Sequence, residues 1–153
     1  MDNIITIDWQ LMQDNLIRVG LAFLLAAPLG WERKKWRTGA GLRTFPVVAM
    51  AACGYALIAK TMPDASAEVQ SRLLQGLLAG IGFIGGGAIL KAHGNIRGLV
   101  TAASIWNTGA IGAAVAYERE EIAIILAAIN FFTLILLAPV VSHDRENGSD
   151  DDP

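Results

Sequence analysis

Apolar residues fill five long stretches of the chain, and short polar segments separate these stretches. Each stretch has roughly 16 to 20 residues, near the length of a helix that crosses about 30 Å of hydrocarbon. The pattern therefore predicts five membrane-spanning helices, at residues 16–31, 42–59, 73–90, 98–117 and 122–141.

The first stretch departs most from a simple apolar span. Arg18 lies near its start and Pro28 near its end. We expect the Arg18 side chain to reach toward the headgroups and Pro28 to kink the helix. Before this stretch, Trp9 and Met12 continue an apolar spacing typical of a helix. This segment is either a separate helix in the membrane interface or an N-terminal extension of the first span.

The connections between the stretches are too short for a second domain, so residues 1–141 are expected to form one membrane domain. Residues 142–153 are polar and acidic, and we expect a disordered tail. The acidic N-terminus does not resemble a cleaved signal peptide. With 54% hydrophobic and 17% charged residues, the composition is also too apolar for an ordinary soluble domain. The predicted fold class is all-α, a polytopic membrane helix bundle.

Basic residues are unevenly distributed among the connections. Eight of the twelve lie in the first and third connections, at the start of the second span or in the tail, and four lie on the alternate side. Basic residues in short loops stay in the cytoplasm. We expect a multi-pass membrane protein with its N-terminus outside and its C-terminus cytoplasmic.

The third stretch contains Gly80, Gly82 and Gly85 in the order G-x-G-x-x-G, as in dinucleotide-binding folds. That fingerprint needs a preceding strand and an acid about twenty residues further on, and both are missing here. We expect no bound nucleotide. Small residues four apart instead let another helix backbone approach closely. The predicted helix-packing positions are Gly76, Gly80, Gly82 and Gly86.

Polar side chains recur within the fourth stretch, at Thr101, Ser104, Asn107 and Thr108. They are expected either to form hydrogen bonds between helices or to line a polar pocket or partner contact near the cytoplasmic half. Single amides also interrupt the third and fifth stretches, at Gln75 and Asn130. Structural hydrogen bonding is the favoured interpretation for both.

The first connection is rich in basic and aromatic residues. Lys34, Lys35 and Arg37 are expected to hold anionic headgroups, with tryptophans anchoring the interface. Glu32, Arg33 and Arg43 lie where apolar sequence begins or ends. A pair between Glu32 and either arginine would neutralise charge at the membrane boundary, and ionisable groups in such positions are functional candidates.

Three segments resemble the signature segments of the MgtC/SapB family of bacterial inner-membrane proteins. They are "GWERKKWRTGAGLRT", "GIGFIGGGAIL" and "IRGLVTAASIWNTGAIG", and the resemblance covers residues 16–138. It implies a bundle of about five spans with the N-terminus outside. The family pattern falls on Gly30, Glu32 and Arg33; Ala40, Gly41, Arg43 and Thr44; Gly80 to Phe83; and Arg97 to Trp106.

The resemblance also implies a role. The best-known branch is a virulence factor linked to growth in low magnesium, thought to inhibit the membrane sector of ATP synthase. That branch carries a C-terminal domain of the ACT type, and this chain is expected to be a short form without it.

Two functions fit the sequence. One is a regulator that packs against itself or another membrane complex, and the other is an oligomeric transporter or channel for Mg²⁺ or another ion. Mg²⁺ is usually met by carboxylates, and the five stretches contain no Asp or Glu. We favour the regulator. We expect no enzyme activity, because neither histidine nor Cys53 has a plausible catalytic partner. No cofactor, bound metal or nucleic acid is expected. The expected partners are the lipid bilayer, a second copy and a membrane protein.

Overall fold

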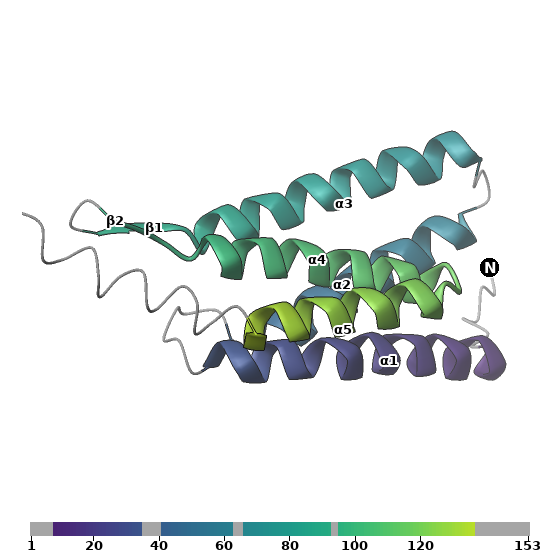
Figure 1. Ribbon diagram of the computed structural model, residues 1–153. Helices are drawn as coiled ribbons and strands as arrows, with labels where there is room; N and C mark the ends of the chain where they lie inside the picture. Colours follow the sequence, from purple (N-terminus) through teal and green to yellow (C-terminus); the bar gives the residue numbers. More distant parts are fainter. Residues whose placement is uncertain (1–7, 35–40, 63–65, 93–94, 137–153) are drawn as a thin grey trace, which may run out of the picture.

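The computed structural model describes residues 8–34, 41–62, 66–92 and 95–136. Within these ranges the chain forms five helices and one small antiparallel hairpin (Figure 1). The helices are α1 (Trp9–Lys34), α2 (Thr44–Thr61), α3 (Ala67–Gly87), α4 (Leu99–Ala116) and α5 (Glu120–Leu136). The predicted helical bundle is confirmed.

Helix α1 begins well before the first predicted span. Asp8 caps it, because its carboxylate accepts hydrogen bonds from the backbone N–H groups of Gln10 and Leu11 at 3.0 and 3.1 Å. The helix then runs without interruption through Pro28. Of the two interpretations of the N-terminal segment, the extension of the first helix is therefore the one observed from Trp9 onward.

The third connection differs from the prediction. Helix α3 ends at Gly87, so Leu90 does not belong to it. Strands β1 (Leu90–Ala92) and β2 (Asn95–Arg97) follow as a hairpin, in place of the last residue of the third predicted span and the connection after it. Three glycines close the helix, and glycine weakens a helix interior. The tail and residues 137–141 of the fifth predicted span lie outside the described residues.

Helix α4 is the centre of the bundle and packs on all four other helices. Its core residues Ile105, Ile111 and Val115 are fully buried. Helix α3 occupies the outer edge and packs mainly on α4 and α2 (Figure 1). This arrangement brings the C-terminal end of α1, the start of α2, the hairpin and the start of α4 to the same end of the molecule.

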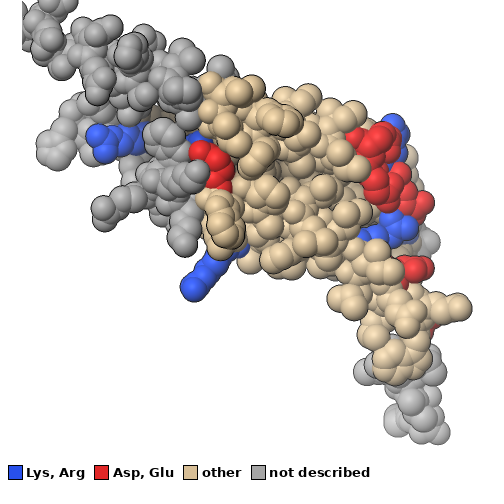
Figure 2. Space-filling model, turned by 60° about the horizontal axis from the view of Figure 1, so that its bottom comes forward, with Lys and Arg blue, Asp and Glu red and all other residues tan. Residues whose placement is uncertain are grey.

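Two of the described helices, Thr44–Thr61 and Leu99–Ala116, are long and apolar enough to cross a membrane. The other three helices are shorter or more polar than these two. Helix α1 carries Arg18, Glu32 and Arg33, α3 begins with a polar turn, and α5 is described for 17 residues. In the face shown in Figure 2, charged side chains gather at the two ends and an uncharged surface separates them.

Candidate functional site

The end of the bundle that carries the hairpin contains a buried ion pair in the last turns of α1. The guanidinium of Arg33 donates to one carboxylate oxygen of Glu32, with Nη2 at 2.8 Å and Nε at 2.9 Å. Both residues are 7% exposed. Removing two charges from water is costly, so such a pair persists only where its geometry satisfies both groups.

The segment that precedes α2 covers this end of α1. A Cβ atom on Gly30 would lie 2.9 Å from the Cα atom of Leu42 and 3.0 Å from the carbonyl oxygen of Gly41. Only glycine therefore allows the two backbones to approach this closely. The structure selects Arg33 as the partner of Glu32, whereas the alternative partner Arg43 has an exposed side chain at the entry to α2.

A row of hydroxyl groups faces inward along α4. Thr101, Ser104 and Thr108 are 1%, 3% and 0% exposed. The hydroxyl of Thr108 donates to the backbone carbonyl of Ser104 at 2.8 Å, within the same helix. The hydroxyl of Ser104 donates to Oδ1 of Asn130 on α5 at 3.1 Å. One of these groups thus bonds within its helix and another between helices.

A second amide reinforces the contact between α4 and α5. Nδ2 of Asn107 donates to the backbone carbonyl of Leu126 at 3.3 Å. Nδ2 of Asn130 is buried and has no hydrogen-bond partner in the part of the chain that the structure describes. A buried donor without an acceptor costs about 1–3 kcal/mol. This seam of Ser104, Asn107 and Asn130 is therefore polar but not fully satisfied.

The structure brings most of the sequence-predicted candidates to one end of the bundle without joining all of them, whereas Ser104 and Asn107 lie further along α4. Thr44 opens α2, Arg97 ends β2, and Thr101 lies in the first turn of α4. Arg43 and Arg97 are exposed at this end. Lys35, Trp36 and Arg37 lie outside the described residues.

The glycines divide into two groups that the sequence does not separate. A Cβ atom on Gly112 would overlap the carbonyl oxygen of Ala49 on α2, and one on Gly85 would lie 3.1 Å from the carbonyl oxygen of Ala102 on α4. A Cβ atom on Gly109 would overlap the Ile81 side chain. At Gly76, Gly80, Gly82 and Gly86 it would meet no neighbouring atom within 4 Å. The four predicted packing glycines therefore make no close contact with another helix of the described chain.

Sequence reasoning missed an ion cluster at the opposite end. Oε1 of Glu118 accepts from Arg18 Nη2 of α1 at 3.1 Å and from Lys60 Nζ of α2 at 2.9 Å. Lys60 also donates to the carbonyl oxygen of Ala116 at 3.1 Å, at the end of α4. Cations are favoured at a helix C-terminus. The cluster ties α1 and α2 to the turn between α4 and α5.

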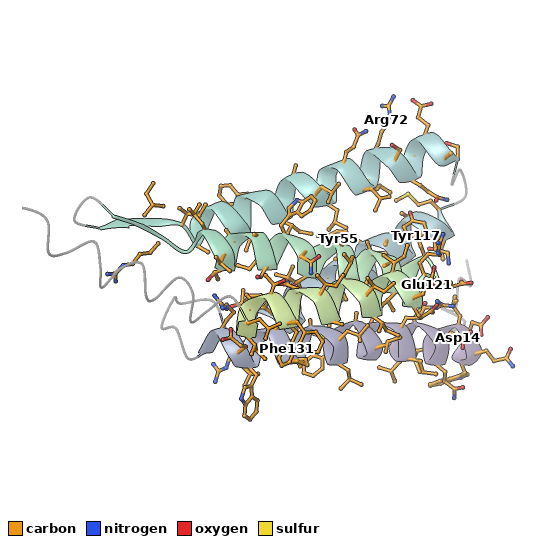
Figure 3. The ribbon with its side chains drawn as sticks, in the orientation of Figure 1. Asp14, Tyr55, Arg72, Tyr117, Glu121 and Phe131 are labelled. Atoms are coloured by element: carbon orange, nitrogen blue, oxygen red, sulfur yellow. The ribbon has the colours of Figure 1, made fainter. Side chains whose placement is uncertain are left out.

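The surroundings of Glu118 alter its acidity. Its pKa lies below the ordinary value of 4.5, first because of the hydrogen bond from Lys60 and then because of the positive charges of Lys60 and Arg18. Glu118 also has a φ angle of 59°, in the left-handed region that favours glycine. In the sequence, this cluster is indicated only by the presence of Arg18 within an apolar stretch. The partner of Arg18 could not be identified without the fold. Tyr117 and Glu121 mark this end of the bundle in Figure 3.

The described residues contain no group of three His, Cys, Asp or Glu side chains that could hold a metal ion. The site residues are instead a buried ion pair, a polar seam and exposed arginines at the end of an apolar helical bundle. The bundle is built of helices, and two of the described ones are long and apolar enough to cross a membrane, as in the polytopic helical class of membrane proteins.

Comparison with known proteins gives the family. The MgtC family model matches residues 19–143, and the chain belongs to this family. It is 34% identical to Protein SrpB of Synechococcus elongatus over 133 residues, which cover 79% of this chain and 71% of that protein. No solved structure matches.

Two further relatives carry informative names. The chain is 36% identical over 115 residues to the putative magnesium transporter YhiD of Escherichia coli K12, covering 71% of this chain and 54% of YhiD. It is 38% identical over 91 residues to Protein MgtC of Brucella abortus, covering 60% of this chain and 37% of that protein. The chain thus spans about half or less of these two relatives.

Proposed function

We propose that this protein is a non-catalytic regulator of the bacterial inner membrane that acts by packing against other membrane proteins. The observation that carries the proposal is the buried pair of Glu32 and Arg33, separated by 2.8 Å. The Glu32 carboxylate at the end of α1 is already neutralised by the guanidinium of Arg33. An ion path needs carboxylates that exchange their partner for the ion, and a buried pair resists this exchange.

The polar seam supports the same proposal. Ser104 and Asn107 bond to α5, so these groups act in helix packing rather than as ligands for a passing ion. Charged residues that are exposed lie at the ends of the bundle, where they can meet a partner or anionic headgroups. By the family resemblance, the first partner to test is the membrane sector of ATP synthase.

The second candidate is an ion transporter formed by several copies, favoured by the name of YhiD as a putative magnesium transporter. In such an assembly, Glu32 from each copy would have to leave Arg33 and face a shared path. This candidate predicts Mg²⁺ flux that depends on Glu32.

Reconstitution into proteoliposomes that contain a Mg²⁺-sensitive dye separates the two. The regulator predicts the same rate of dye response as in protein-free liposomes. Flux above that background in the wild-type protein, lost in Glu32→Gln and retained in Glu118→Gln, would overturn the proposal. Glu118→Gln is the matched control, because it removes a carboxylate at the opposite end of the bundle.

The membrane partner is tested in vesicles made from native membranes. Inverted vesicles with and without the protein are compared for proton pumping driven by ATP hydrolysis, and tagged protein is captured in mild detergent. Capture of an intact membrane complex by the wild type supports the regulator. Absence of any co-purifying membrane protein contradicts it.

A further inference from the structure

The cations whose side chains the structure describes fall into two groups. The first group pairs with carboxylates of the chain: Arg18 and Lys60 with Glu118, Arg33 with Glu32, Arg72 with Glu68, and Arg119 with Glu121. Arg43 and Arg97 form the second group. Both are exposed, and neither makes an ion pair or side-chain hydrogen bond with the described residues. Their guanidinium groups are therefore available to an anion from outside the chain.

Arg43 and Arg97 lie at the same end of the bundle, where α2 and α4 begin (Figure 1). Among the described residues, the carboxylate at this end is Glu32, which is 7% exposed and bound to Arg33. The exposed carboxylates of the described chain lie toward the opposite end, where Figure 3 shows Asp14 and Glu121. The positive charge of the two arginines is therefore not neutralised by the described chain.

The positions of the two arginines place them at one boundary of the membrane. Helices α2 and α4 are the described helices that are long and apolar enough to cross it. Arg43 directly precedes α2, and Arg97 lies two residues before α4. When both helices cross the bilayer, the two guanidinium groups reach the depth of the lipid phosphates on the same side. A phospholipid presents its phosphate at that depth, whereas a soluble anion is not confined to it.

Exposed apolar side chains accompany both arginines. Leu42, which precedes Arg43, is 39% exposed, and Ile96, which precedes Arg97, is 55% exposed. Leu99 at the start of α4 is 56% exposed. Such side chains can lie among acyl chains while the adjacent guanidinium reaches a phosphate. A free anion would leave them in water, so the combination favours a lipid.

The backbone next to each arginine is held in place. The N–H of Thr44 donates to the carbonyl oxygen of Gly41 at 3.0 Å, on either side of Arg43. Arg97 pairs with Leu90 across the hairpin, and Gly98 then turns the chain into α4 with a φ angle of 90°. Because the backbone is already ordered, binding a headgroup there costs mainly side-chain freedom.

We propose that Arg43 and Arg97 bind the phosphate groups of anionic phospholipids at the end of the bundle where α2 and α4 begin. A guanidinium group donates paired hydrogen bonds to phosphate oxygens. An anionic headgroup is preferred to a zwitterionic one, because the latter brings a cation toward a surface that is already positive. This surface goes beyond the proposed function, since it needs no protein partner and would serve a transporter as well as a regulator.

Lipid titration of the purified protein in nonionic detergent tests the proposal. Phosphatidylglycerol and phosphatidylcholine are added separately, and native mass spectrometry gives the association constant of each. The wild type is expected to prefer phosphatidylglycerol. Arg43→Gln and Arg97→Gln should each lower its association constant about fivefold and change that of phosphatidylcholine less. Arg72→Gln is the matched control, because it removes an exposed arginine at the opposite end that is paired with Glu68, and it should leave both constants unchanged.

Equal affinity of the wild type for the two lipids, or undiminished binding of phosphatidylglycerol by the double variant of Arg43→Gln and Arg97→Gln, would overturn the proposal. An equal loss in Arg72→Gln would do the same, because a positive charge anywhere on the protein would then suffice. Inorganic phosphate is expected to displace phosphatidylglycerol no better than chloride at the same ionic strength. Stronger displacement by phosphate would assign the arginines to a soluble anion and contradict the lipid.

Protein stability provides a separate check on the two variants. In detergent without added lipid, Arg43→Gln and Arg97→Gln are expected to unfold at the wild-type temperature or above. Neither side chain bonds to the described residues, and a cation at the start of a helix is unfavourable. A lower unfolding temperature or a failure to fold would show that the arginine already has a partner within the chain, which contradicts the proposal.

Discussion

Gly112 provides the sharpest test of how the bundle is held together. It lies where α4 crosses α2, and its replacement by alanine places a methyl group against the carbonyl oxygen of Ala49. The same methyl carbon would lie only 3.0 Å from the carbonyl carbon of Ala49 and from Cβ of Ala52. Backbone atoms in a helix cannot move aside as a flexible side chain can, so the two helices must separate.

The magnitude follows from two opposing effects. Overpacking a core contact costs about 1–3 kcal/mol. Replacing glycine by alanine inside a helix contributes about 1 kcal/mol of stabilisation through helix propensity. We therefore expect Gly112→Ala to lower the free energy of unfolding by up to about 2 kcal/mol, taking the larger cost less the propensity gain. Gly80→Ala gains the propensity without the clash, since nothing lies within 4 Å of its Cβ position.

Thermal unfolding of both variants in the same detergent, followed by circular dichroism, measures the difference. Gly112→Ala is expected to unfold at a lower temperature than the wild type, and Gly80→Ala at the same or a higher temperature. Equal stability of the two variants would show that α2 and α4 do not approach as closely as the structure indicates.

Three further predictions concern single contacts. Gly98→Ala should destabilise the protein more than Gly112→Ala in the same unfolding assay, because Gly98 has a φ angle of 90° and its Cβ atom would overlap the carbonyl oxygen of Ala88. Asn130→Leu should leave the free energy of unfolding within about 1 kcal/mol of the wild-type value, since it removes the hydrogen bond from Ser104 together with the buried unpaired donor Nδ2 of Asn130. A large drop in unfolding temperature would show that Nδ2 of Asn130 has a partner in the wild type. Glu118→Gln should lower the unfolding temperature at neutral pH. Because the pKa of Glu118 is lowered, its contribution is present above pH 4.5 and is lost as the pH falls through the lowered pKa, so the difference from the wild type should shrink in acid; a pH-independent difference contradicts this.

The sequence predicted the helices well because lipid leaves few choices. In hydrocarbon the backbone must satisfy its own hydrogen bonds, so an apolar stretch of this length forms a helix. The boundaries were less certain. The glycines that end α3 and the hairpin after it have no strong apolar period, and Trp9 to Leu16 fits a helix in two different settings.

The candidate site was predicted in part, for the same physical reason. Glu32 and Arg33 were identifiable because charged groups at the edge of an apolar stretch are rare, and the structure then selects between the two arginines. The ion cluster around Glu118 joins residues that are up to 100 positions apart, between Arg18 and Glu118. Such a pairing depends on which helix ends meet, and periodicity contains no information about that.

The glycine pattern shows a similar limit. Gly85, Gly109 and Gly112 contact neighbouring helices closely, whereas Gly76, Gly80, Gly82 and Gly86 do not. Spacing alone identifies small residues but not the direction in which they face. That direction depends on the rotation of each helix, which is set by the packing of the larger side chains around it.

The lengths of the two central helices have a consequence for the surrounding lipid. Helices α2 and α4 have 18 residues each, which corresponds to about 27 Å. Arg43 and Lys60 lie at the two ends of α2, so neither end can sink further without submerging a charge. The bilayer must therefore match the protein, and a thicker one must become locally thinner at a cost of fractions of a kcal/mol per Å. Acyl-chain length thereby becomes a variable that selects where in the membrane this bundle resides.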